Sequence, residues 1–315
     1  MKQSRDGRHP LLVTILGPTA GGKTRLAALT AQALNGEVLS ADSRQVYRGM
    51  DIGTGKDLDD YIVEGKRIPA HLIDLVDAGT RFSVFEYLQA YTSAFEDVTS
   101  RGKMPILCGG SGLYLDAVIL GYRFVPAPRD EALRSELETL DFDRLTERLS
   151  SLKTLHNKTD LRDRPTLVRA IEVATFERAH PEQAISAPKA EHLVFGLDWP
   201  RGLLRQRIRR RLEERLDQGL IEEVRRLLDQ GVDPEVLDGY GLEYRFVLRH
   251  LRGELDRREL TDKLAQAIGK FAKRQSTWFR RMEKRGCAIT WLDGREGPSR
   301  NLKRILESVQ SRRNS

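Results

Sequence analysis

Residues 11–24 read Leu11-Leu-Val-Thr-Ile-Leu-Gly17-Pro-Thr-Ala-Gly-Gly22-Lys23-Thr24, an apolar run followed by a glycine-rich loop. A continuous apolar run that ends in glycine is typical of a buried parallel strand. Residues 24–34 then space their apolar side chains at helical intervals, and Asn35-Gly36 supplies a stop signal. The sequence therefore predicts a strand, a loop and a helix in that order.

The loop between this strand and helix fits the pattern G-x-x-x-x-G-K-[ST] in the context that the pattern requires. Its glycines let successive backbone N–H groups point inward at an anion, and the start of the helix adds a positive dipole end. Lys23 would place a charge on a terminal phosphate, and Thr24 would offer a hydroxyl to a phosphate-bound Mg²⁺. The same motif occurs in nucleotide-binding and ATP-binding proteins. It leaves open whether the ligand here is ATP, GTP or another diphosphate ester. The predicted diphosphate-binding residues are Gly17, Pro18, Thr19, Ala20, Gly21, Gly22, Lys23 and Thr24.

Strand and helix patterns alternate up to residue 122. This alternation predicts an α/β protein with a P-loop-type parallel sheet flanked by helices. Further strands are expected at 37–41, 71–76 and 104–108, and helices near 83–99 and 112–120.

Beyond this first part of the core, residues 123–190 are charged and helical, so we expect a helical insertion there. Residues 191–295 would complete the core and add basic helices, and residues 296–315 would form a loose polar tail. The expected elements are helices at 129–140, 142–152, 165–179, 200–231 and 260–283, with strands at 192–198 and 288–292.

The composition narrows the class of protein further. The chain has 315 residues, with 53 Lys and Arg against 46 Asp and Glu, which gives a net charge of +7. No apolar run approaches the roughly 20 residues that span a bilayer, so we expect no membrane association. The start of the chain does not resemble a signal peptide, and the two cysteines do not suggest a disulfide framework. We expect a cytoplasmic protein, and a monomer.

Polar residues follow two of the expected strands, at the edge of a parallel sheet where ligands bind. Asp42 follows the second strand and could hold Mg²⁺, act as a general base or cap the next turn. Ser111 follows the strand at 104–108 and could donate a hydrogen bond or belong to a packing turn. In a P-loop kinase, Asp74 or Asp77 could serve as a magnesium ligand, and this alternative stays open.

Two segments near the C-terminus are strongly basic. Residues 201–211 carry six arginines and no acidic residue. Residues 270–281 interleave aromatic and cationic side chains, a mixture that suits a polynucleotide backbone with unstacked bases nearby. The alternative is that the aromatic side chains of the second segment face the core. Together with the phosphate loop, these segments suggest RNA as a partner.

Seven motifs follow one another along the chain: Gly17-Pro-Thr-Ala-Gly-Gly-Lys-Thr24, Asp42-Ser-Arg-Gln-Val-Tyr47, Met50-Asp-Ile-Gly-Thr-Gly-Lys56, His71-Leu-Ile-Asp74, Gly109-Gly-Ser-Gly-Leu-Tyr114, Arg169-Ala-Ile-Glu-Val173 and Ala272-Lys-Arg-Gln-Ser-Thr-Trp-Phe279. In this order they make the sequence similar to the tRNA dimethylallyltransferase family from about residue 11 to 293. The resemblance implies transfer of a dimethylallyl group from dimethylallyl diphosphate to the exocyclic N6 of the adenosine just 3′ of a tRNA anticodon. The P-loop would then hold a prenyl diphosphate instead of ATP.

The resemblance also implies roles for individual residues. Asp42 matches the general base, which takes a proton from a poorly nucleophilic amine as it attacks. Lys23, Thr24 with Mg²⁺, and Arg211 would stabilise the departing pyrophosphate. The positions implied to contact tRNA in the anticodon stem-loop are Asp42, Ser43, Arg44, Gln45, Ser111, Arg134, Arg169, Lys273, Arg274 and Gln275.

The chain departs from the family pattern at positions that the family uses to contact RNA. Pro165 and Thr166 stand where the family has a Gln-Arg pair, and Glu243 replaces a glycine. These departures concern tRNA recognition and leave the residues of the transfer chemistry in place.

Three other functions are considered beside the leading one. These are prenylation of a free adenine nucleotide, a P-loop kinase or NTPase, and an RNA-binding P-loop protein without catalysis.

Overall fold

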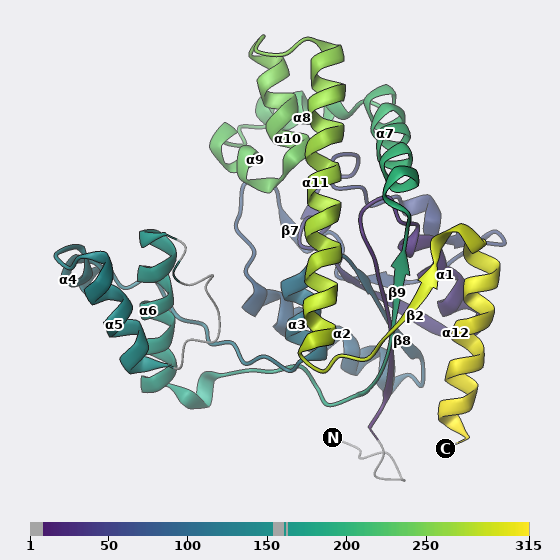
Figure 1. The fold of residues 1–315 in the computed structure, drawn as a ribbon, viewed down its shortest axis with the longest axis horizontal. Helices are drawn as coiled ribbons and strands as arrows, with labels where there is room; N and C mark the ends of the chain where they lie inside the picture. The colour runs from purple at the N-terminus through teal and green to yellow at the C-terminus, as the bar shows by residue number, and fades with distance from the viewer. Residues whose placement is uncertain (1–8, 154–160, 162, 315) are drawn as a thin grey trace. The chain divides into compact units, whose positions relative to one another are not determined.

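The computed structural model describes residues 9–153, 161 and 163–314. The chain divides into two compact units, one formed by residues up to 121 with those from 187 onward, and one by residues 122–186. The expected polar leader, residues 1–8, and residues 154–160 and 162 of the expected insertion lie outside the described residues. The ribbon is drawn in Figure 1.

The larger unit is built on a parallel sheet whose strand order is β10-β9-β1-β8-β2-β6. Every pair of neighbours in this order runs parallel. The predicted α/β class is therefore confirmed. Its strands are β1 (Leu11–Leu16), β2 (Gly36–Ala41), β6 (Ala70–His71), β8 (Met104–Gly109), β9 (Glu191–Asp198) and β10 (Ile289–Asp293).

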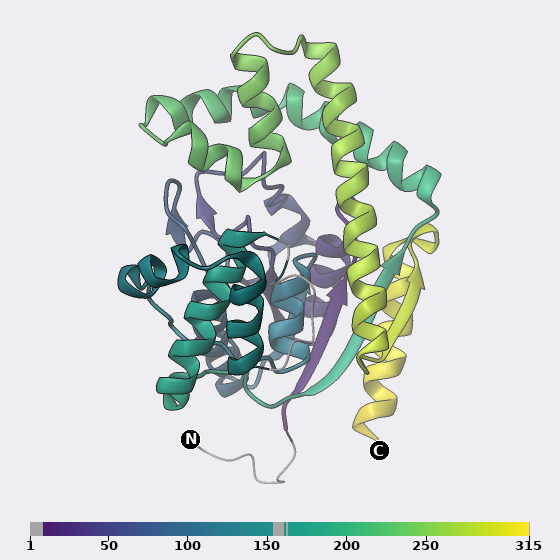
Figure 2. The same ribbon diagram turned by 60° about the vertical axis from the view of Figure 1, so that its left-hand side comes forward.

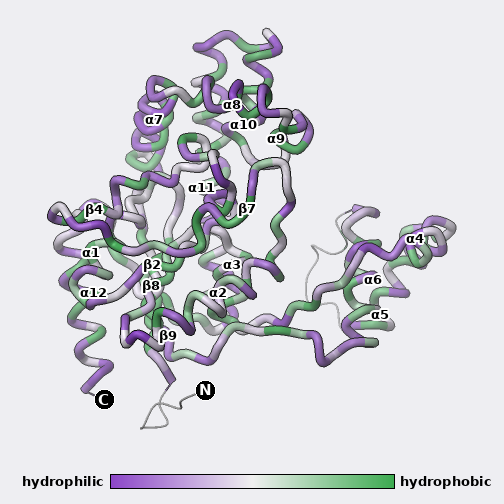
Figure 3. Tube along the Cα trace, turned by 180° about the vertical axis from the view of Figure 1, so that it is seen from behind, coloured by the Kyte–Doolittle hydropathy of each residue, from purple (hydrophilic) through white to green (hydrophobic). Residues whose placement is uncertain are grey.

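Helices cover the sheet because β1, β2 and β8 are buried along nearly their whole length, so side chains on both of their faces are removed from water. Figure 3 colours the trace by hydropathy and includes hydrophobic residues around β2 and β8. Val13 and Ile15 pack in one cluster with α1 (Lys23–Ala33) and α12 (Gly297–Arg313). The helix α2 (Val84–Ser100) packs on β2 and β8 and beside α3 (Gly112–Ile119). A capping box fixes the start of α2, in which the Ser83 and Glu86 side chains each accept from the other residue's N–H.

A second hydrophobic cluster joins the helices of the C-terminal half to the loop after β2. The single helix expected at 200–231 is broken at Gly219, whose φ of 101° ends one helix and begins the next. Two short helices that the sequence did not predict follow this break. The helices are α7 (Arg201–Asp217), α8 (Leu220–Asp229), α9 (Pro234–Tyr240), α10 (Leu242–Leu251) and α11 (Arg257–Lys284).

The helix α11 is the long element that links this helical region to the sheet. It packs on α7 and α10 and reaches α3, as Figures 1 and 2 show. Its first turn is fixed by a second capping box, between Asp256 and Glu259. The helix therefore carries the basic segment at 270–281 to the edge of the sheet that holds the phosphate loop.

One expected strand is largely absent among the described residues. Of residues 71–76 only His71 continues the sheet, within β6, because Leu72 and Asp74 have positive φ angles of 66° and 57° and turn the chain away. Short strands form in this region instead: β3 (Tyr47–Arg48) pairs with β7 (Val76–Asp77), and β4 (Ile62–Val63) pairs with β5 (Lys66–Arg67) after the 3₁₀ turn Leu58–Tyr61.

The expectation of a loose tail after residue 295 is wrong. A 3₁₀ turn at Gly294–Glu296 leads into α12, which places Ile305 and Val309 in the core against α1. Its apolar residues recur at helical spacing among charged ones, so this face is buried although the segment is polar overall.

The smaller unit is helical. It contains α4 (Glu131–Glu138), α5 (Phe142–Leu152) and α6 (Arg164–Ala179), followed by a 3₁₀ turn at Pro181–Gln183. Asp130, Asp141 and Asp163 cap the three helices by accepting from backbone N–H groups. Leucines of the three helices form its core, for example Leu137, Leu149 and Leu167.

Among the described residues of the whole chain, no helix has the length and apolar character needed to cross a membrane.

Candidate active site

A cavity of about 530 Å³ opens at the carboxyl edge of the sheet, within the larger unit. Its walls come from the phosphate loop, the turns after β2 and β8, the loop before the 3₁₀ turn at 58–61, and one face each of α7 and α11. The predicted site residues that line it are Thr19, Ala20, Gly22, Lys23, Thr24, Asp42, Ser43, Arg44, Gln45, Ser111, Arg211, Arg274 and Gln275.

The phosphate loop is held in shape from outside. Gly22 has a φ of 85°, a left-handed conformation that suits glycine at the start of α1. The Trp199 indole donates to the carbonyl of Gly21 at 3.0 Å, and Arg207 Nε donates to the carbonyl of Ala20 at 2.8 Å. The Arg207 guanidinium in turn lies 4.4 Å from the centre of the Trp199 ring. Two acceptor oxygens of the loop are therefore satisfied by the protein itself.

Gln275 of α11 joins the phosphate loop to the turn after β8. Its Oε1 accepts from the N–H of Thr19 at 2.9 Å, and its Nε2 donates to the carbonyl of Gly110 at 2.9 Å. The side chain is only 7% exposed. The buried Gln275 amide therefore bridges two backbone segments and stabilises the phosphate loop.

Three cations converge on the cavity. Burial lowers the pKa of Lys23, although the nearby Asp42 carboxylate opposes the shift. Burial and the neighbouring charge of Arg215 lower the pKa of Arg211 to about 9, and burial also lowers the pKa of Arg215. Three cations that line one cavity concentrate positive charge there, so the cavity favours an anionic ligand.

Asp57 is the carboxylate nearest to two of these cations. Its Oδ2 is in close contact with the Arg211 guanidinium, and its Oδ1 lies 3.3 Å from Arg215 Nη2. Asp57 also lines the cavity. Nothing in the local sequence marks this residue, because its partners are more than 150 positions away.

Asp42 lines the same cavity and fills one of its three expected roles, that of a cap. Its Oδ1 accepts from the backbone N–H of Arg44 at 3.0 Å, which caps the turn after β2. Its Oδ2 makes no hydrogen bond with any described residue, so that oxygen remains available to a ligand. The electrostatic coupling between Asp42 and Lys23 places both groups in one site.

Ser111 connects the turns after β2 and β8. Its hydroxyl accepts from the Ser43 N–H at 2.9 Å and lies 3.1 Å from the Ser43 hydroxyl. The packing role expected for Ser111 is therefore present, and the residue also lines the cavity.

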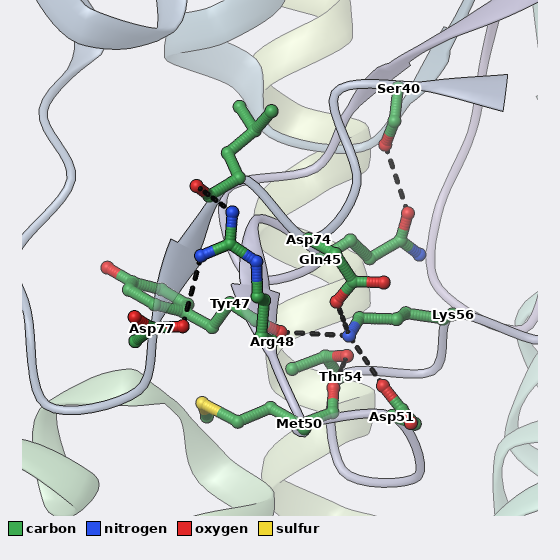
Figure 4. A network of polar contacts seen from close by, with 12 residues as sticks. Ser40, Gln45, Tyr47, Arg48, Met50, Asp51, Thr54, Lys56, Asp74 and Asp77 are labelled. Carbon is green, nitrogen blue, oxygen red and sulfur yellow. Dashed lines mark hydrogen bonds and ion pairs between the residues drawn. The ribbon is translucent and has the colours of Figure 1, made fainter.

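The loop from residue 50 to 56 lines the cavity through Gly53, Thr54 and Gly55. A buried polar network, drawn in Figure 4, holds this loop. Lys56 is fully buried and donates to the Tyr47 carbonyl at 2.8 Å, to Asp51 at 2.5 Å and to Asp74. Gln45 accepts from the Ser40 hydroxyl at 3.0 Å and donates to the Gly55 carbonyl at 3.0 Å.

Three predicted residues belong to this network. The Gln45 amide has partners within the protein at both of its ends, the Ser40 hydroxyl and the Gly55 carbonyl. Asp74, one of the magnesium ligands expected for a kinase, is paired with Lys56, and the other, Asp77, pairs with Arg48 at 3.0 Å. Neither carboxylate lines the cavity, so the kinase arrangement is not supported.

Glu223 of α8 holds the same loop from the other side. Its carboxylate accepts from the N–H groups of Asp51, Ile52 and Gly53 at 2.8, 2.8 and 2.9 Å, and from the Tyr244 hydroxyl at 2.9 Å. A buried carboxylate with four donors is fully satisfied.

One group of residues that line the cavity combines aromatic and charged side chains. Arg44 lies 3.5 Å from Glu243 and 5.4 Å from the centre of the Phe271 ring, and Arg274 lies 5.7 Å from the same ring. Lys273 is exposed on α11 and is not among the lining residues. The departure from the family pattern at Glu243 therefore falls on the cavity wall.

Arg134 and Arg169 lie in the smaller unit, not in the cavity. Arg134 binds Glu172 through two hydrogen bonds of 2.7 and 2.8 Å, and Arg169 binds Glu172 at 3.2 Å and the carbonyl of Ala127 at 2.7 Å. Burial opposes ionisation of Glu172, but these guanidiniums and the Asp130 N–H lower its pKa to about 2. Both arginines thus stabilise their own unit.

A divalent cation suits the donors that the cavity offers. The Thr24 hydroxyl has no hydrogen-bond partner among the described residues, and one oxygen of Asp42 is equally unused. Hydroxyl and carboxylate oxygens are the ligands that Mg²⁺ prefers. No group of three or more His, Cys, Asp or Glu side chains could enclose a metal in the described part of the chain, so the remaining oxygens around a bound Mg²⁺ would come from a phosphorylated ligand or from water.

Sequence reasoning missed several residues of the cavity. Arg207, Arg211 and Arg215 recur every four residues and so share one face of α7, but only Arg211 was singled out. The spacing could have revealed the other two. Asp57 and Asp60 also line the cavity without any sequence signal that we recognise.

Fold and site together define a P-loop-type α/β protein with a cation-rich pocket. The family model described as IPP transferase matches residues 45–282. The chain is 54% identical over 298 residues to tRNA dimethylallyltransferase 2 of Syntrophotalea carbinolica, covering 94% of this chain and 99% of that protein. It is also 54% identical over 288 residues to tRNA dimethylallyltransferase 1 of Geotalea daltonii, covering 91% and 92%.

Solved structures agree with this match. A tRNA isopentenylpyrophosphate transferase of Bacillus halodurans superposes with a TM-score of 0.68 at 31% identity, covering 95% of each chain. The corresponding enzyme of Staphylococcus epidermidis gives a TM-score of 0.67 at 30% identity, covering 96% of this chain and 99% of that one. The chain therefore belongs to the IPP transferase family and is an enzyme of the tRNA dimethylallyltransferase type, as its sequence motifs predicted.

Proposed function

We propose that this enzyme transfers a dimethylallyl group from dimethylallyl diphosphate to N6 of the adenosine just 3′ of a tRNA anticodon, releasing diphosphate. The observation that carries the proposal is the shared cavity, in which Lys23, Arg211 and Arg215 face the same space as Asp42. The cations suit the leaving group and the carboxylate suits an amine nucleophile, so one cavity serves both reactants.

The phosphate loop, Lys23 and Arg211 would bind the diphosphate. As the allylic carbon–oxygen bond breaks, its electron pair stays on the diphosphate oxygen, and nearby fixed cations stabilise that charge. Mg²⁺, held by Thr24 and the diphosphate itself, would neutralise further charge on the leaving group. Family membership agrees with a divalent metal, and the choice of Mg²⁺ rests on the oxygen donors described above.

Asp42 would act as the general base. The adenine N6 lone pair forms the new carbon–nitrogen bond, and the N6 proton moves to the free Oδ2 of Asp42. The capping bond to the Arg44 N–H keeps the carboxylate pointed in one direction. The target base must leave its stack to reach the cavity, as in other enzymes that modify bases.

Recognition of the tRNA would involve both units. Arg44, Phe271 and Arg274 line the cavity with cationic and aromatic side chains, and Lys273 lies exposed on α11 beside Arg274. We assign residues 122–186 to RNA binding as well, with Arg134 and Arg169 acting mainly by holding that unit together. Gln45 and Gln275 would support the cavity walls rather than contact RNA directly. A cytoplasmic location and a monomeric state remain predictions from the sequence.

The direct test is incubation of the purified protein with Mg²⁺, labelled dimethylallyl diphosphate and unmodified tRNA, followed by nucleoside mass spectrometry. Parallel reactions contain AMP in place of tRNA, or ATP alone. We expect label on the adenosine beside the anticodon. Label on AMP without label on tRNA would select a free nucleotide as the acceptor. ATP hydrolysis without prenyl transfer would contradict the proposal.

A further inference from the structure

We propose that Asp57 promotes release of the diphosphate product by competing with it for Arg211 and Arg215. The inference rests on the proposed function, because it takes these two arginines as part of the diphosphate site. It adds a role for a carboxylate that no motif of the sequence singled out.

The geometry places a single carboxylate across two arginines. Arg211 and Arg215 are four residues apart and therefore adjacent on one face of α7. Asp57 uses Oδ2 for the first and Oδ1 for the second. Two cations on one cavity wall would repel each other, so the carboxylate offsets that repulsion and keeps both guanidiniums oriented.

The loop that carries Asp57 is shaped to bring it there. Asp57 has a φ of 43°, a left-handed conformation that a residue with a side chain adopts at a cost. It precedes the 3₁₀ turn at 58–61, yet its side chain makes no capping hydrogen bond there. Gly55 has a φ of 65°, and a Cβ at that position would collide with both guanidiniums. The loop thus lies directly on the arginines, and the Asp57 carboxylate is committed to them rather than to the helix cap.

A bound diphosphate would require the same N–H donors. Its oxygens and the Asp57 carboxylate would then share two cations, and the two anions would repel each other at short range in a site partly removed from water. Asp57 therefore weakens anion binding. The repulsion from Asp57 is larger for free pyrophosphate than for dimethylallyl diphosphate, because loss of the prenyl group leaves one more ionisable oxygen on the product. The carboxylate consequently disfavours the product more than the substrate.

The test compares pyrophosphate binding to three variants and the wild type, measured by titration calorimetry at fixed Mg²⁺. Asp57→Asn removes the competing charge and keeps the size of the side chain. Asp59→Asn is the matched control, because Asp59 is an exposed residue of the same loop and does not line the cavity. Asp57→Glu restores the charge on a longer side chain.

We expect Asp57→Asn to bind pyrophosphate about tenfold more tightly, the scale of one short-range charge interaction that is partly screened. Its product-inhibition constant for pyrophosphate should fall by a similar factor. Asp59→Asn should match the wild type, and Asp57→Glu should return most of the way to it. If Asp57 only oriented the arginines, its loss would instead weaken pyrophosphate binding.

Unchanged or weaker binding by Asp57→Asn would overturn the proposal, and so would a wild type that does not bind pyrophosphate. Because inorganic pyrophosphate is the probe, the result is readable even if no tRNA is prenylated. Failure of the proposed function would appear separately, as absent label on tRNA with Asp57→Asn still binding pyrophosphate more tightly. The two ideas can therefore fail independently.

Discussion

The side chain of Gln275 accepts a hydrogen bond of 2.9 Å from the backbone N–H of Thr19, across 256 positions of the sequence. The basic C-terminal helix and the phosphate loop are thus one structure. The family resemblance implies that Gln275 contacts tRNA. In the structure this residue of α11 also shapes the proposed diphosphate site.

Replacing Gln275 by Leu should weaken diphosphate binding more than it slows the chemical step. The partly buried N–H of Thr19 and the buried carbonyl of Gly110 would lose their partner, which costs about 1–3 kcal/mol for a fully buried group and less for a partly buried one. We expect the KM for dimethylallyl diphosphate to rise about tenfold or more, measured at saturating tRNA. Thr277→Ala, on an exposed part of α11, is the control and should leave the KM unchanged. A rise in the KM for tRNA alone would show that Gln275 contacts RNA instead.

Replacing Asp42 by Asn should slow transfer by roughly 10²-fold to 10⁴-fold, the scale expected for losing a general base. The amide can still accept from the Arg44 N–H, so the turn should persist and pyrophosphate affinity should change little. Single-turnover transfer and calorimetric titration would measure these two quantities. A variant that transfers at the normal rate would remove Asp42 from the role of base.

Replacing Glu223 by Ala should destabilise the larger unit. Three backbone N–H groups and the Tyr244 hydroxyl would lose their buried acceptor, so we expect a loss of about 3–5 kcal/mol in the free energy of unfolding. Urea unfolding followed by circular dichroism would measure it. The neighbouring Glu222 is exposed, and Glu222→Ala should lie within about 0.5 kcal/mol of the wild type. Equal stability of the two variants would contradict this account of the loop.

The smaller unit should lose stability in acid. The pKa of Glu172 is about 2 in the folded protein against an ordinary value of 4.5, so its contribution is complete above about pH 4.5 and is lost as the pH falls toward 2. Hydrogen exchange of α6, corrected for intrinsic rates, should report this loss. Glu172→Gln should weaken protection of α6 already at pH 7, and it should remove most of the dependence on pH in this window. Unaltered protection in that variant would show that the two arginines do not depend on Glu172.

The sequence was most informative where one local pattern determines the structure. The apolar run of β1, the glycines of the phosphate loop and the helical spacing of α1 lie within 24 residues of one another, so their arrangement could be predicted. The strand predicted at 71–76 from its apolar residues is wrong, because positive φ angles at Leu72 and Asp74 turn this stretch out of the sheet. Sequence prediction also failed for α12, whose buried face is diluted by charged residues.

Side-chain roles were harder to predict than side-chain positions. Asp42 and Lys23 could be placed at one edge from the topology of a parallel sheet. Gln45 and Gln275, however, were read as RNA contacts, and the structure gives both amides buried backbone partners. Asp57 could not be found at all, because its importance depends on arginines that only the fold brings near it.

The central claim is that one cavity holds both the departing diphosphate and the base that deprotonates adenine. A crystal structure with a thiolo analogue of dimethylallyl diphosphate tests it most directly. We predict that the diphosphate lies on the phosphate loop against Lys23, with the reactive carbon turned toward the free oxygen of Asp42. An analogue bound on the loop with its carbon facing away from Asp42, or bound elsewhere, would contradict the account.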